Sequence, residues 1–240
     1  MNNKTAFLKV QQRINKLASA DYDNIQPWQF IESFNKAQVE WVRRQLEGIN
    51  QTKTGDEASK RRVDDLNILL TTLPLTLTHY KNFDQSTTLP SYPSGNAYLE
   101  YKSIDLTATK ECCEGEERSM QVYQGEEANV TWYLTDDNKK PSFDWGETFM
   151  TMYNGKVRIY TNNDFKIKSA KLMYYRQPRG LQMLNVRDPY SGNLPAKEVI
   201  CEFKDDICEL LCDDTASIIA GDIENFQQMQ RNQMAAERNN

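Results

Sequence analysis

The hydrophobic pattern of this 240-residue chain changes its period twice, and this change restricts the folds that the chain can adopt. In residues 5–74, apolar side chains recur at every third or fourth position, as they do on one face of an α-helix. From Leu75 to Phe203, apolar and polar residues alternate, which is the pattern of half-buried β-strands. A helical pattern returns from about Lys204. The sequence therefore predicts an α+β fold with helices at both ends of the chain and strands between them.

Three helices are expected before the strands. The first covers about Thr5–Ser19, and the second begins at Pro27, a residue that the first helical turn tolerates, and stops at Gly48. The third is capped by Asp56 and ends at Pro74. These helices should pack against the final one through the following apolar residues: Phe7, Ile14, Phe30, Phe34, Trp41, Leu66 and Leu70 on one side, and Ile207, Leu211 and Ile218 on the other.

The central region contains a strong hairpin signal. In TFMTMYNGKVRIYT, two alternating runs flank Asn154-Gly155, a pair that readily takes the positive φ angles of a two-residue turn. AYLEYK, SMQVYQ, ANVTWYL and FKIKSAKLMYY also alternate and are predicted strands. Because the final helix has no helical neighbour in the sequence, it should pack on the first helices. We therefore expect a helical bundle made by residues 1–74 and 204–240, with an antiparallel β domain, residues 75–203, inserted between them.

Three closely spaced cysteines lie at the beginning of the final helix or just before it: Cys201, Cys208 and Cys212. Their spacing differs from the paired knuckles of structural zinc sites, and Cys208 and Cys212 share one helix face with apolar neighbours. Four acidic residues lie mostly on the opposite side: Asp206, Glu209, Asp213 and Asp214. We expect reduced, buried cysteines that bind no metal and no cofactor. A small metalloenzyme that uses these three thiols is the least favoured alternative.

Composition and motifs argue against several classes of protein. The net charge of −5 disfavours a nucleic-acid binder that neutralises phosphates. The single histidine, His79, lies in an alternating run and is expected to be structural. The sequence contains neither a nucleophile elbow nor a glycine-rich phosphate loop. We therefore expect that the protein is not an enzyme. The odd cysteine count and a polar, helical start predict a reducing compartment. No stretch has the length of a membrane span.

Tyrosine is frequent, with twelve residues in the chain. Several lie on predicted strands and could together form a carbohydrate-binding face: Tyr98, Tyr101, Tyr133, Tyr153, Tyr160, Tyr174 and Tyr175. Ordinary strand or subunit-interface residues are the more frequent explanation of such tyrosines.

The chain ends in a polar segment, NFQQMQRNQMAAERNN, in which eight residues are Asn or Gln. This composition suits a contact arm better than a core, because a few flexible apolar side chains can anchor an otherwise polar peptide. The candidate partner contacts are Phe226, Met229, Arg231, Met234 and Arg238.

Three stretches of the chain resemble virion structural proteins of the crAss-like tailed phages. They are LASADYDNIQPWQFIESFNKAQVEWVRRQLEG, KLMYYRQPRG and EVICEFKDDICELLCDDTASIIAGDIENFQQMQRNQ. The order of helices, inserted strands and a final helix with a polar tail is also similar to that of head-to-tail connector (adaptor) proteins.

The resemblance implies a structural ring subunit of the phage neck or tail. Such a ring is usually twelve-fold, docks on the portal protein, contacts other tail ring proteins, and passes genome DNA through its lumen without specific binding. The alternative function is a virion module that binds host-surface glycans through the tyrosine-bearing strands.

Overall fold

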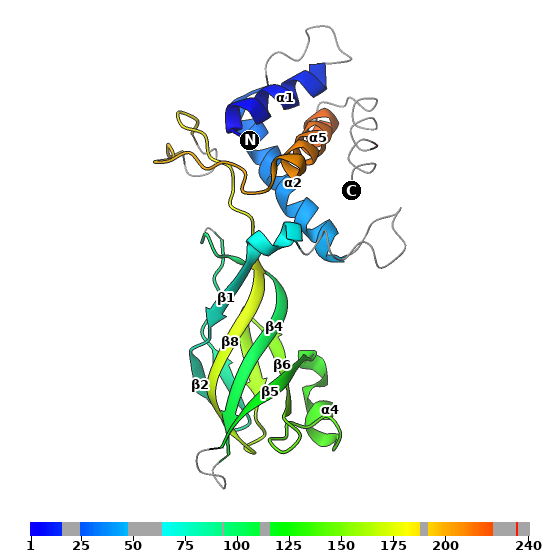
Figure 1. The fold of residues 1–240 in the computed structure, drawn as a ribbon, viewed down its shortest axis with the longest axis vertical. Helices are drawn as coiled ribbons and strands as arrows, with labels where there is room; N and C mark the ends of the chain where they lie inside the picture. The colour runs from blue at the N-terminus through cyan, green and yellow to red at the C-terminus, as the bar shows by residue number, and fades with distance from the viewer. Residues whose placement is uncertain are drawn as a thin grey trace. The chain divides into compact units, whose positions relative to one another are not determined.

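The computed structural model describes residues 1–15, 25–47, 64–92, 94–110, 116–187 and 192–222, together with residue 234. Helices α1 (Asn3–Asn15), α2 (Pro27–Glu47) and α5 (Asp205–Asp222) come from the two ends of the chain, and the strands come from between them (Figure 1). The protein therefore has an α+β fold. The chain divides into two compact units, a helical unit of Met1–Ile68 and Pro178–Asn240 and a sheet unit of Leu69–Gln177.

The helices begin at residues that satisfy free backbone groups. The Thr5 N–H of α1 donates to the side-chain oxygen of Asn2 at 2.7 Å, so Asn2 caps this helix. Pro27 opens α2 as predicted, and the side chain of Gln29 accepts a hydrogen bond from the Gln26 N–H at 2.9 Å. This contact is the second half of a capping box, and it compensates for the weak cap that Gln26 itself provides.

Helix α5 packs against both α1 and α2. The core between them contains Ile14, Phe30, Phe34, Trp41, Leu66, Ile207 and Leu211, as the hydrophobic pattern predicts. Edge-on ring contacts join Phe7 to Phe30, with centroids 5.4 Å apart, and Trp41 to Phe203, at 5.1 Å. The contact between Trp41 and Phe203 joins segments that lie more than half of the chain apart in sequence.

The predicted extent of the third helix is wrong. Asp64–Leu66 is helical, but the chain then turns through η1 (Asn67–Leu69) into strand β1 (Leu70–Pro74), so Leu70 belongs to the sheet and not to a third helix. The proposed cap at Asp56 lies outside the described residues. On α5, the buried residue is Ile219, whereas Ile218 is only partly buried.

The acidic side of α5 also differs from expectation at one residue. The side chain of Asp214 is buried and forms an ion pair with Arg44 of α2. Burial raises the pKa of Asp214, while the charge of Arg44 and its hydrogen bond oppose this rise. Glu209 and Asp213 pair with Arg13 of α1 at the rim of the same contact.

The buried side chain of Asn3 binds two backbone segments that precede α5. The amide nitrogen of Asn3, which is 1% exposed, donates to the carbonyl oxygens of Gln182 and Val199, each at 3.0 Å. Gln182 and Val199 also form an isolated β-bridge. The first turn of α1 thereby fixes both ends of the loop that leads towards α5.

Eight strands of the described chain form one curled sheet in the order β1-β8-β4-β5-β6-β7-β3-β2. Their bounds are β1 (Leu70–Pro74), β2 (Leu77–His79), β3 (Phe83–Ser86), β4 (Tyr98–Thr109), β5 (Glu117–Gln124), β6 (Glu147–Tyr153), β7 (Lys156–Tyr160) and β8 (Lys166–Arg176). The edge strands β1 and β2 are separated in the sequence by Leu75 and Thr76 alone. The sheet must therefore roll until its two edges come together, and it encloses a core that contains Leu106, Met150 and Ile159.

The hairpin prediction is confirmed, and two other predictions for the sheet are wrong. Asn154 and Gly155 have φ angles of 49° and 68°, and they join β6 to β7 with Tyr153 opposite Lys156. The ANVTWYL run is not a strand but forms η2 (Glu127–Asn129) and α4 (Val130–Thr135). The sheet is also not wholly antiparallel, because β5 and β6 pair in parallel across this helical crossover.

We predict that Trp41→Ala lowers the free energy of unfolding by about 3–5 kcal/mol, because it leaves a cavity where α2 meets Phe203. The matched control is Trp28→Ala on the same helix, where the side chain is 40% exposed against 3% for Trp41. The control should cost less than about 1 kcal/mol. Urea denaturation of the two variants measures the difference, and equal losses would contradict this description of the helical core.

Candidate binding surface on the sheet unit

Three adjacent strands, β6, β7 and β3, present a polar row of side chains on the outside of the sheet. Arg158 of β7 lies directly opposite Thr151 of β6 and Gln85 of β3. The alternate positions of these strands, Met150 and Ile159, point into the core. We call this side the outer face, defined by Phe83, Gln85, Phe149, Thr151, Tyr153, Arg158 and Tyr160.

Glu127 connects this polar row to the segment that crosses from β5 to β6. Its carboxylate forms an ion pair with Arg158 and accepts a hydrogen bond from the Thr151 hydroxyl. Nε of Arg158 donates to the Gln85 side-chain oxygen at 2.9 Å. The carboxylate and the guanidinium therefore lie side by side, each held by a second polar partner.

Two aromatic rings flank the guanidinium of Arg158. Its central carbon lies 4.0 Å from the centroid of the Tyr153 ring and 5.2 Å from that of the Phe83 ring. Both distances are within the range of cation–π attraction. Together with Gln85 and Glu127, these rings fix the guanidinium, which is unusual for a long side chain at a protein surface.

A second row of the outer face is aromatic. Tyr160 contacts Phe83 at 5.6 Å and stacks on Phe149 at 4.5 Å, measured between ring centroids. The row continues at each end, through Tyr80 stacked on Phe83 at 5.0 Å and through Tyr133 and Trp132 of α4. Tyr80 is 45% and Trp132 52% exposed, so the row is buried in its middle and open at both ends.

Gly125 permits the close approach of α4 to this aromatic row. A Cβ atom at this position would lie 3.0 Å from the Tyr133 ring and 3.4 Å from the Phe149 ring. Because real Cβ atoms scarcely approach so closely, a larger residue would force Tyr133 away from Phe149. The glycine thus sets the position of α4 over β6.

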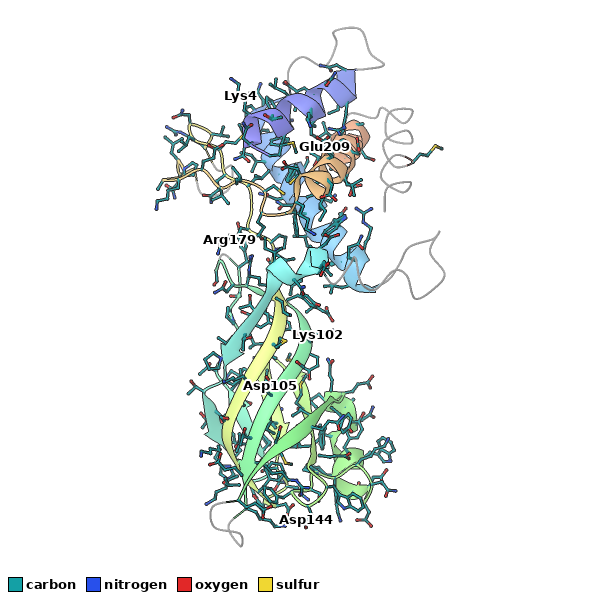
Figure 2. The ribbon with its side chains drawn as sticks, viewed as in Figure 1. Lys4, Lys102, Asp105, Asp144, Arg179 and Glu209 are labelled. Atoms are coloured by element: carbon teal, nitrogen blue, oxygen red, sulfur yellow. The ribbon has the colours of Figure 1, made fainter. Side chains whose placement is uncertain are left out.

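Trp145, the most exposed tryptophan of the described chain, lies in a turn at one end of the sheet unit. Its neighbour Asp144 is labelled in Figure 2. Trp145 is 83% exposed, yet the backbone around it is well bonded. Arg118 donates to the carbonyl oxygens of Phe143 and Asp144, at 2.9 and 2.7 Å, and the Phe143 N–H donates to Asp164 at 2.7 Å. Lys110 contacts the other oxygen of Asp164 at 2.9 Å.

The structure separates the tyrosines that the sequence analysis grouped. Tyr153 and Tyr160 lie on the outer face, with Tyr133 packed over it, whereas Tyr98, Tyr101, Tyr174 and Tyr175 lie on β4 and β8. Tyr174 is buried, and its hydroxyl donates to the Asn96 carbonyl at 2.7 Å. Burial raises the pKa of its neighbour Tyr98 to about 12. These four tyrosines thus belong to a different part of the sheet, and the seven tyrosines do not form the single face that was the less favoured alternative.

Sequence reasoning missed Arg158, Glu127 and Gln85. The two-residue turn at Asn154-Gly155 contained the signal for Arg158, because such a turn places Thr151 directly opposite it. No sequence signal places Glu127 beside them, since it directly precedes the run ANVTWYL, which is predicted to be a strand and instead forms helical turns.

The three predicted cysteines, Cys201, Cys208 and Cys212, are buried. The thiol of Cys208 lies 3.5 Å from the Phe203 carbonyl oxygen. Burial raises the pKa of Cys212 to about 11. His79 is exposed, and its Nδ1 lies 2.5 Å from an oxygen of the buried Asp84. Of the arm residues, Met234 is 62% exposed. Phe226, Met229, Arg231 and Arg238 lie outside the described residues.

Among the described residues, no group of three or more His, Cys, Asp and Glu side chains could hold a metal ion. In the same part of the chain, no helix has the length and apolar character needed to cross a membrane. No protein-family model matches the chain, and no curated protein matches it either.

The turn that carries Trp145 should make stability depend on pH through Asp164. Burial acts to raise the pKa of Asp164, but the hydrogen bond from the Phe143 N–H and the charge of Lys110 outweigh it, so the pKa lies below its usual value. This carboxylate stabilises the fold above its unfolded pKa of about 3.9, and the contribution is lost as pH falls through the lower folded pKa. Asp164→Asn should therefore flatten the acid limb of the stability curve.

The matched control for this test is Asp144→Asn in the same turn, because that side chain is 77% exposed. Urea unfolding of the three proteins between about pH 6 and pH 3 gives the comparison. If Asp164→Asn keeps the wild-type dependence on pH, Asp164 does not hold the turn electrostatically.

Proposed function

We propose that this chain is a structural ring subunit of the neck or tail of a crAss-like tailed phage, with no catalytic activity of its own. In this proposal the subunit is made in the host cytoplasm, forms a ring, usually twelve-fold in similar proteins, and docks on the portal protein. Other tail ring proteins would adjoin it, and genome DNA would pass through its lumen. The support is the resemblance of its two ends and of β8 to such proteins, combined with the position of the polar arm.

The observation that carries the proposal is that the two ends of the chain, which carry most of the resemblance, form one helical core from α1, α2 and α5. Helix α5 ends at Asp222, with Ile219 and Ala220 buried near its end. The one arm residue that is described, Met234, is exposed. A polar segment with spaced apolar anchors suits a contact with a neighbouring protein.

The finer architecture belongs to the same proposal. We interpret α1, α2 and α5 as a helical bundle that forms the docking body, with the sheet unit as an inserted domain. The rim of this body is tied by ion pairs, Lys9 and Arg13 to Glu209 and Arg44 to Asp214. Such a body would stay folded while its arm engages the portal.

Removal of residues 225–240 should leave a folded protein with an unchanged thermal midpoint but abolish docking to the portal. The reason is that the polar composition of the arm suits a contact with a partner better than a core, and its apolar anchors would be lost from that contact. Thermal unfolding followed by circular dichroism measures the first part. Co-sedimentation with the purified portal of the same phage measures the second.

A matched pair of full-length variants separates the anchors from the rest of the arm. Phe226→Ala with Met229→Ala should lose docking, whereas Gln227→Ala with Gln228→Ala should keep it. Wild-type docking by the truncated protein would show that the arm is not the portal contact.

The ring lumen should have little affinity for duplex DNA. The chain carries a net charge of −5, and several of its described basic side chains already pair with carboxylates, among them Lys110, Arg158 and Lys168. Like charge lets a duplex slide through a conduit instead of being held. Filter binding at low salt should show weak retention of DNA, and tight binding that falls steeply with salt would contradict the proposal.

A further inference from the structure

We infer that the outer face of the sheet unit binds an uncharged sugar ring at Tyr153, Arg158 and Glu127. This inference is independent of ring formation by the helical unit. It rests on three features: a paired hydrogen-bond donor and acceptor, an exposed aromatic ring beside them, and the neutralisation of Arg158 by Glu127.

The donor and the acceptor are held ready for two neighbouring hydroxyl groups. An ionised carboxylate only accepts hydrogen bonds, and a guanidinium only donates them. Arg158 directs Nε to Gln85 and Nη1 to Glu127. The guanidinium also bonds to the Tyr160 hydroxyl. Of its five N–H donors, these three bonds leave at least one free on Nη2. Adjacent hydroxyls of a sugar can accept from Nη2 and donate to Glu127, whose side chain is 33% exposed.

The aromatic component is Tyr153, which is 48% exposed. The guanidinium of Arg158 lies over its ring, 4.0 Å from the centroid, so the ring and the hydrogen-bonding groups share one small area. Tyr153 directly precedes the Asn154-Gly155 turn, and the Gly155 carbonyl accepts a hydrogen bond from the Leu89 N–H at 2.8 Å. A ring fixed in this way can contact the C–H face of a sugar at a low cost in conformational entropy.

The balance of charge favours an uncharged ligand over an anion. Glu127 neutralises Arg158, and Thr151 and Gln85, the other polar residues in the row, are uncharged. Lys156, opposite Tyr153, adds a single positive charge at the turn. Sulfated or phosphorylated polymers require clusters of unpaired basic side chains, and the outer face does not present one among its described residues.

A purely structural role for the same pair is the competing explanation. In that case Arg158 and Glu127 would serve only to fasten η2 over β6. Such a role predicts a loss of stability on substitution but leaves no reason for an exposed Tyr153 in contact with Arg158. Binding and stability must therefore be measured together.

The test uses the full-length protein and a panel of neutral monosaccharides, namely glucose, galactose, mannose and N-acetylglucosamine. Saturation-transfer NMR should show contact between the protein and the ring protons of at least one sugar. Tyr153→Ala should weaken this binding about tenfold while leaving the thermal midpoint within error. Arg158→Lys should also weaken it, because lysine keeps the charge but lacks the planar fork.

The matched control is Tyr92→Ala, at a tyrosine that is 77% exposed and lies outside the outer face. It should bind the sugar as the wild type does. Heparin serves as the anionic probe, and its binding should not depend on Arg158.

Three results would overturn the inference: no saturation transfer to any sugar of the panel, an equal loss of binding in Tyr92→Ala, or binding to heparin alone. A protein partner on this face would appear as the first of these. Ring assembly and portal docking by Tyr153→Ala report on the proposed function separately.

Discussion

The burial of α5 against α1 and α2 is the contact on which the rest of the molecule depends. It joins two ends of the chain that are separated in sequence by the whole sheet unit, so the helical core exists only when both are present. Its centre is apolar, with Phe30, Phe34 and Leu211 fully buried, and its rim is ionic. Burial of the Asp214 carboxylate is tolerated because Arg44 pairs with it; an unpaired charge in that place would be strongly destabilising.

The sheet unit is constrained in a different way, by the short link between its two edge strands. Because Leu75 and Thr76 alone separate β1 from β2, the sheet curls, and one face becomes a core while the other stays outside. The helical crossover between β5 and β6 then covers part of that outside face. It brings Glu127 to Arg158 and Tyr133 to Phe149, and in this way creates a surface of fixed polar and aromatic groups.

These two units suit two different tasks. The described residues of the helical unit form an apolar core with an ionic rim, and the polar arm that follows them would engage a neighbouring protein. The sheet unit has aromatic rings that are buried in the middle of a row and open at its ends, and a guanidinium that is already immobilised. Self-assembly and ligand recognition would then depend on separate sets of residues, so that each can be altered without loss of the other.

The sequence by itself determined the α+β class, the packing of the final helix on the first two, and the hairpin at Asn154-Gly155. Each follows from local periodicity or from turn chemistry, which act over a few residues and do not depend on distant parts of the chain. The hairpin even determined that Arg158 faces Thr151. Only the tertiary structure decided that Leu70 continues into a strand and that residues 127–135 form helical turns, because short apolar runs are compatible with either state until their neighbours are known. It also decided that Asp214 is buried and that Glu127 meets Arg158, since both contacts join segments whose approach no local pattern records.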